Sequence, residues 1–120
     1  MMSIKFAETF AEEWINSWNS HDIAKVLSHY SNDFTIETPR ALEVLPKSDG
    51  IVIGKEAVKQ YWLTSMKRRP DLQFQLLDVL TGINGLSIYY LNTATNKRAV
   101  EIMMFNGDKK VNRAIVHYSK

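Results

Sequence analysis

Apolar residues recur at helical spacing in the first part of the chain. An aromatic residue stands at every fourth position from Phe6 to Trp18, so these side chains share one face of a helix that we predict over residues 4–18. Polar residues follow it, and Ser20 or Asp22 is expected to open the next helix.

The second predicted helix is short and is followed by a strand. Apolar residues from Ile23 to Tyr30 fall at i, i+3, i+4 and i+7, which again gives one apolar face. Residues 31–33 are a serine, an asparagine and an aspartate, and we interpret them as the turn that ends this helix. Alternation over residues 34–38 then predicts a strand that runs up to Pro39.

Residues 40–53 have the least regular pattern, and we predict a flap or a loose hairpin there, with a turn around Pro46–Gly50. After Gly54, apolar residues over 57–66 return to helical spacing and predict a third helix that ends before Pro70.

The period changes from helical to alternating after Asp71, which predicts an antiparallel meander. Asn84-Gly85 is typical of a hairpin with a primed two-residue turn. Turns are also expected at 96–97 and 106–108. The four predicted strands cover about 72–82, 86–93, 98–106 and 110–118.

Three helices followed by a curved antiparallel sheet give an α+β architecture, with the helices on one sheet face and an apolar pocket at the open end. A length of 120 residues, 45% of them hydrophobic and 23% charged, is that of one globular domain, which we expect to span 1–120.

Charge and cysteine content exclude several function classes. A formal charge of +2 gives no reason to expect a nucleic-acid or membrane partner. The run Lys67-Arg68-Arg69 precedes Pro70, where it complements a helix dipole better than it makes an anion-binding patch. The chain has no cysteine, no signal-like segment and no apolar run of membrane-spanning length, so we expect a cytoplasmic protein.

Glu101 is an acid in the middle of an otherwise apolar strand. Alternation places it on one face with Ala99 and Met103, where burial would raise its pKa and suit it to donate a hydrogen bond or a proton. The alternatives are a structural glutamate paired with Arg98, Arg113 or a tyrosine, or a shifted register that leaves it in solvent.

Several segments in this order resemble the nuclear transport factor 2-like superfamily, which includes ketosteroid isomerases and SnoaL-like polyketide cyclases. The resemblance implies a cone-shaped, cystatin-like roll, with a pocket for a small hydrophobic molecule and a homodimer through the outer sheet face. It rests on Trp14-Ile15-Asn16-Ser17-Trp18-Asn19-Ser20-His21-Asp22, Tyr30-Ser31-Asn32-Asp33-Phe34, Thr38-Pro39 and Gly54-Lys55-Glu56-Ala57-Val58.

The catalytic residues of the ketosteroid isomerases are only partly matched. Thr38 stands at the position of their general base and cannot act as one near neutral pH. Trp14 matches their oxyanion tyrosine, and Tyr30 and Trp62 match the tyrosines that support it. Glu101 matches their neutral aspartate. Steroid isomerisation by the same mechanism is therefore not expected.

Two functions stay open. The first is isomerase, cyclase or lyase-type proton transfer on a hydrophobic carbonyl or ring compound, with Glu101 and Tyr30 as catalytic residues. The second is a non-catalytic ligand-binding or dimeric interaction module. We expect no cofactor, and no metal because the histidines lack ligand spacing. The predicted ligand-binding residues are Trp14, Trp18, Thr38, Tyr61, Trp62, Met103, Val116 and Tyr118.

Overall fold

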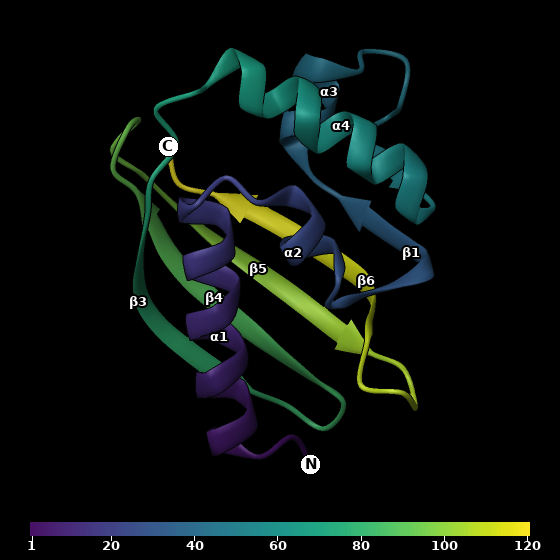
Figure 1. Cartoon of the computed structure of the whole chain (residues 1–120), viewed down its shortest axis with the longest axis vertical. Coiled ribbons are helices and arrows are strands. Elements are labelled where there is room, and N and C mark those ends of the chain that lie inside the picture. Colours follow the sequence, from purple (N-terminus) through teal and green to yellow (C-terminus); the bar gives the residue numbers. More distant parts are fainter.

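A computed structural model describes residues 1–120 as a layer of helices packed on one six-stranded sheet (Figure 1). The helices are α1 (Ile4–Asn19), α2 (Ile23–Leu27), α3 (Pro39–Val44) and α4 (Lys55–Arg68). The strands are β1 (Tyr30–Glu37), β2 (Ile51–Ile53), β3 (Phe74–Thr81), β4 (Gly85–Asn92), β5 (Lys97–Phe105) and β6 (Val111–Tyr118).

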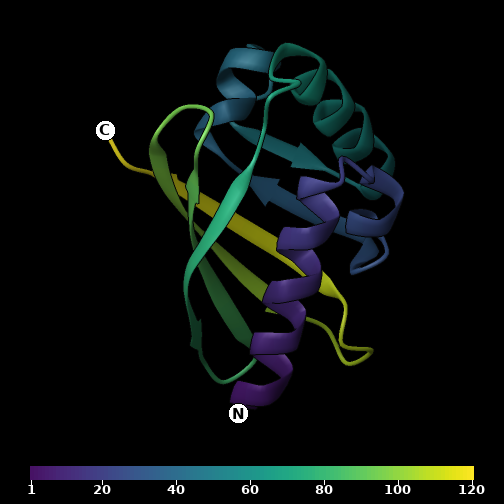
Figure 2. The same cartoon turned by 60° about the vertical axis from the view of Figure 1, so that its left-hand side comes forward.

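The sheet has the strand order β2-β1-β6-β5-β4-β3. Strands β3 to β6 form the predicted meander, and β1 joins it by pairing parallel with β6. Figure 2 shows the sheet bending around α1, with the helices on its concave side. The predicted α+β cone is thereby confirmed, although it has four helices instead of three. None of these helices has the length and apolar character required to cross a membrane.

Side-chain caps begin the first two helices, α1 and α2. Ser3 accepts a hydrogen bond from the Phe6 amide at the start of α1, and Asp22 accepts one from Lys25 at the start of α2. At the other end of α1, the Asn19 side chain donates to the Phe74 carbonyl at 2.8 Å and accepts from the Phe74 amide at 2.7 Å. These two bonds fix the end of α1 against β3.

The predicted turn at residues 31–33 is wrong, because those residues belong to β1. Tyr30, predicted at the end of the second helix, is the first residue of this strand and pairs with Val111 of β6. Helix α2 ends earlier, at Leu27. Pairing with a distant strand therefore overrides the local helical spacing.

The flap or loose hairpin predicted over residues 40–53 is also wrong in part. Its first half is the helix α3, and its last residues form β2, which pairs with β1. The hydroxyl of Thr38 accepts a hydrogen bond from the Arg40 amide, and Pro39 occupies the first turn. Threonine followed by proline is a helix-start signal, and here it sets the helix that carries Arg40.

The primed turn predicted at Asn84-Gly85 does not form, because neither residue has a positive φ. Positive φ values in the hairpins occur instead at Asn96 and Lys109. Gly85 is the first residue of β4, and a Cβ built on it would lie 2.3 Å from the Met103 carbonyl oxygen. Glycine is therefore needed here for the close approach of β4 to β5, not for its turn conformation.

Substitution of Gly85 by alanine should lower the free energy of unfolding by about 1–3 kcal/mol, because two backbones would have to separate. The matched control is Gly107→Ala, whose added methyl group meets no atom within 4 Å. Urea denaturation of both variants measures the difference. Equal stabilities for the two variants would contradict the close packing of β4 on β5.

Candidate functional site

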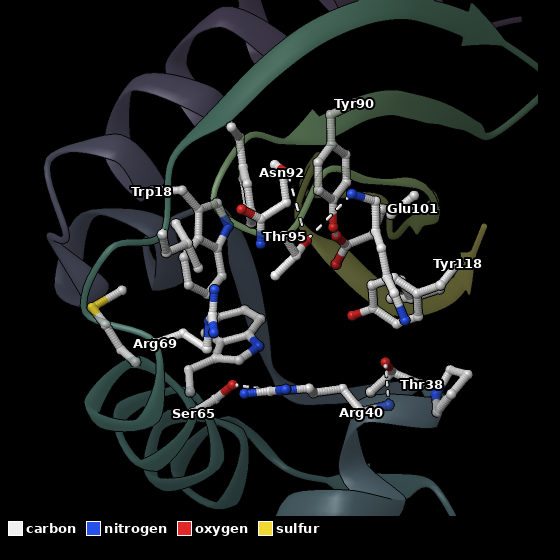
Figure 3. Close-up of a pocket in the computed structure, with 18 of the residues that line it drawn as sticks. Trp18, Thr38, Arg40, Ser65, Arg69, Tyr90, Asn92, Thr95, Glu101 and Tyr118 are labelled. Atoms are coloured by element: carbon white, nitrogen blue, oxygen red, sulfur yellow. Dashed lines mark hydrogen bonds between the residues drawn. The ribbon is translucent and has the colours of Figure 1, made fainter. Parts of the chain in front are cut away.

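A cavity of about 440 Å³ lies between the sheet and the end of the helical layer. Its wall draws on α1, α3, α4 and five of the six strands, so it exists only when the fold is complete. The volume falls within the range of small-molecule sites in proteins. Figure 3 shows its polar side chains converging from opposite sides, with Glu101 and Tyr118 facing Thr38 and Arg40.

Glu101 extends from β5 into this cavity and is 4% exposed. Burial raises the pKa of its carboxyl to about 8, and only a hydrogen bond from the Tyr90 hydroxyl, 3.4 Å from Oε2, opposes this shift. No arginine or lysine forms an ion pair with it. The carboxyl is therefore largely protonated at neutral pH and can donate a hydrogen bond or a proton.

Two tyrosine side chains of the cavity wall form hydrogen bonds with Thr38. Burial raises the pKa of Tyr61 and of Tyr118, and hydrogen bonding to Thr38 partly offsets both shifts. Tyr118 is 43% exposed as a residue, but its hydroxyl points into the cavity (Figure 3). Both phenols remain neutral near pH 7, so they act as hydrogen-bond donors and not as bases.

Seven predicted site residues line the cavity, and they come from five different elements or their ends. Glu101, predicted as catalytic, is one of them. The six predicted ligand-binding residues among them are Trp18, Thr38, Tyr61, Trp62, Val116 and Tyr118.

Three predicted site residues do not line the cavity, so direct ligand contact by them is not supported. Tyr30 is 1% exposed and accepts a hydrogen bond of 2.8 Å from the indole nitrogen of Trp14, which is fully buried. Burial and the charge of Glu101 raise the pKa of Tyr30. Met103 is also fully buried. These side chains are part of the hydrophobic core behind the wall.

Sequence reasoning missed several polar residues of the wall, among them Tyr90 and Arg40. Tyr90 lies on β4 two residues after Ile88, so both side chains are on the face of the strand that points to the core. Strand β4 pairs with β5, which carries Glu101. Arg40 belongs to the helix that the Thr38-Pro39 signal starts, a segment predicted instead as a flap. Its side chain donates to the Ser65 hydroxyl at 3.2 Å and pairs with Glu43.

No three histidine, aspartate or glutamate side chains gather as a metal site in the chain. His117 is exposed on β6 and does not line the cavity. His29 contacts the Phe10 ring and lies 3.9 Å from Glu13, away from the cavity. The proton chemistry that the cavity offers therefore centres on one carboxyl and the phenols around it.

Comparison with known proteins identifies the fold. Residues 11–119 match the model of the SnoaL-like domain. A SnoaL-like protein of unknown function from Burkholderia thailandensis is 34% identical, with 98% of each chain covered and a TM-score of 0.93. The predicted resemblance to the nuclear transport factor 2-like superfamily is confirmed. No match was found among curated proteins.

More distant structures share only the fold. AclR, a putative hydroxylase from Streptomyces galilaeus, is 17% identical, with 98% of this chain and 91% of that chain covered and a TM-score of 0.73. A putative SnoaL-like polyketide cyclase from Shewanella denitrificans is 11% identical, with coverages of 95% and 90% and a TM-score of 0.70. The same architecture thus carries proteins described by different chemistries.

The raised pKa of Glu101 predicts a pH-dependent stability. The folded protein keeps this proton from pH 4.5 up to about 8, whereas the unfolded chain loses it near 4.5. The contribution of Glu101 to stability is therefore fully present below pH 4.5 and is lost as pH rises from 4.5 to about 8, by about 3–5 kcal/mol in total. Urea denaturation between pH 5 and 9 should show that the free energy of unfolding of Glu101→Gln rises relative to that of the wild type as pH increases.

The matched control for this experiment is Glu37→Gln, an exposed acid at the end of β1. Its stability should follow the wild-type pH dependence. If the Glu101→Gln and wild-type curves run parallel over this range, the buried carboxyl does not hold its proton and the electrostatic description of the site is wrong.

Proposed function

The chain belongs to the SnoaL-like domain family, and on this basis we propose that it binds a small hydrophobic carbonyl or ring compound and transfers a proton on it. The observation that carries the proposal is a carboxyl buried in the wall of a cavity without a cationic partner. Such a group is costly to bury ionised, and its pKa near neutrality suits general acid–base work.

The proton transfer that we propose uses Glu101 in both directions. The protonated carboxyl gives its proton to an oxygen or carbon of the bound compound and becomes a carboxylate. That carboxylate then takes a proton from a neighbouring carbon, so the enzyme returns to its starting state. The hydroxyl of Tyr118 can donate a hydrogen bond to the substrate oxygen, whereas Tyr30, predicted as catalytic from the sequence, does not line the cavity.

A second function, ligand binding without catalysis, is favoured by a specific feature of the cavity. Glu101 is its only buried carboxyl, since Glu43 is exposed and pairs with Arg40 at 3.2 Å. Thr38 stands where related isomerases have their base. A single acid–base group supports a proton shuttle within one compound, but it does not support reactions that need a separate acid and base at once.

We also propose that a second copy of this chain covers the outer face of the sheet. That face has an apolar stripe in which Val100 pairs with Tyr89 and Ile102 pairs with Ile115 across neighbouring strands. Met104, at the end of the stripe, is 42% exposed. Apolar surface of this kind favours association of two identical faces around a two-fold axis.

Exchange of protons next to a carbonyl tests catalysis without knowledge of the natural substrate. In D2O at pH 7, the protein should accelerate deuterium incorporation into the methyl group of 2-acetylnaphthalene, followed by proton NMR. Glu101→Gln should lower the accelerated rate at least about 100-fold, because its amide cannot exchange a proton with the substrate carbon. Its affinity for the ketone should change little.

Glu43→Gln is the matched control, because it removes an acid from the cavity rim without touching the buried carboxyl. It should leave the exchange rate close to that of the wild type. Binding of the ketone without any acceleration of exchange would contradict the catalytic proposal and support the ligand-binding function.

The proposed dimer predicts a sedimentation mass twice the 13.8 kDa of the chain. Met104→Glu should shift the protein toward the monomer, because it places a charge on the apolar stripe. The matched control, Ile4→Glu, changes a residue that is 63% exposed on α1 and should leave the mass unchanged. A monomeric wild type at about 100 µM would contradict the dimer.

A further inference from the structure

Two N–H groups in the cavity wall have no hydrogen-bond partner. They are the indole Nε1 of Trp18 and the Nε of Arg69, and both atoms are shielded from solvent. Trp18 as a whole is 6% exposed. A buried donor without an acceptor raises the free energy of the folded protein. Such donors are uncommon in native proteins, so two of them in one cavity wall call for a physical explanation.

Both donors belong to the same part of the cavity. Figure 3 shows the indole nitrogen of Trp18 and the guanidinium of Arg69 on one side, across the cavity from Glu101 and Tyr118. Trp18 comes from the end of α1, and Arg69 follows the last residue of α4. The wall therefore has two polar regions, separated by the aromatic side chains that line it.

The cavity lining has more cationic than acidic residues. It includes Arg40, Arg69 and Lys97 but only two acids. One of these, Glu43, pairs with Arg40 at 3.2 Å, and the other, Glu101, is largely protonated near pH 7 because its pKa is about 8. The residues that line the cavity therefore carry a net positive charge near pH 7, which favours an anionic ligand group.

Only part of the Arg69 guanidinium is hydrogen-bonded within the protein. Its Nη2 donates to Asp71 and to the Ala94 carbonyl, each at 3.2 Å, while Nε remains free. Its side chain is 38% exposed, and that of Asp71 is 58% exposed, so water screens the pair strongly. The guanidinium can therefore shift enough to present Nε to an incoming oxygen.

We infer that the compound bound in this cavity carries a carboxylate, which accepts hydrogen bonds from Trp18 Nε1 and Arg69 Nε while its apolar body reaches toward Glu101. This inference rests on the proposed function and narrows its substrate class to amphipathic acids. A carboxylate has two acceptor oxygens, which matches two separate single donors, and its bond to arginine is charge-assisted.

The assignment also gives a role to part of the basic run that sequence reasoning ascribed to the helix dipole. Lys67 is exposed on the last turn of α4, whereas Arg69 turns into the cavity wall. The two residues carry the same charge at nearly the same place in the chain. Their different surroundings make Lys67 a suitable control for charge alone.

Binding of a matched pair of ligands tests this inference. The probes are 6-acetyl-2-naphthoic acid and its methyl ester, which share the aromatic body and the ketone but differ in charge at pH 7. By equilibrium dialysis, the wild type should bind the acid at least about tenfold more tightly than the ester, in keeping with one charge-assisted contact. Raising the salt concentration should reduce this preference.

Variants distinguish the loss of a hydrogen-bond donor from damage to the fold. Arg69→Met should abolish the preference for the acid, Arg69→Lys should restore part of it, and Lys67→Met should keep it. Trp18→Phe should reduce the preference without removing it, because it deletes one donor and keeps an aromatic wall. Affinity for the ester reports whether each variant still forms the cavity.

The outcomes distinguish this inference from the proposed function. Equal affinity for acid and ester in the wild type would overturn the carboxylate site while leaving the proposed ketone binding in place. An acid preference that survives Arg69→Met would also overturn it. If neither probe binds, both the carboxylate site and the proposed function are wrong.

Discussion

The proposed chemistry of this protein depends on the burial of one carboxyl without a cation to balance it. Strand β5 places Glu101 on the concave face of the sheet, where the helical layer shields it from bulk water. The only polar group bonded to it is the hydroxyl of Tyr90, at 3.4 Å. Protonation is the response that costs least in such surroundings, and it converts an acceptor into a donor.

The fold supplies these surroundings through contacts between distant parts of the chain. Asn19 fixes the end of α1 to β3, which brings Trp18 to the cavity, and the Thr38 cap starts the helix that brings Arg40 there. Behind the wall, the bond between Trp14 and Tyr30 satisfies two buried polar groups. Catalytic or binding side chains can be held firmly because core residues behind them are already paired.

The sequence predicts the fold class and the facing of β5 well, because both follow from periodic patterns that agree with the tertiary structure. The prediction of secondary structure fails where pairing with a distant strand determines it. Tyr30 is an example, because it pairs with β6 instead of extending a helix. The cavity is predicted less completely. Alternation identifies Glu101, but whether a buried aromatic such as Trp14 or Trp18 reaches open space depends on packing that no local pattern records.

A direct titration of the Glu101 carboxyl tests whether it keeps its proton at neutral pH. The side-chain carboxyl carbon can be followed by carbon-13 NMR in glutamate-labelled protein, with Glu101→Gln identifying its signal. The titration midpoint is expected near pH 8, within about one unit. A midpoint near the ordinary value of 4.5 would show that the carboxyl is ionised at neutral pH, and would contradict both the proposed proton transfer and its physical basis.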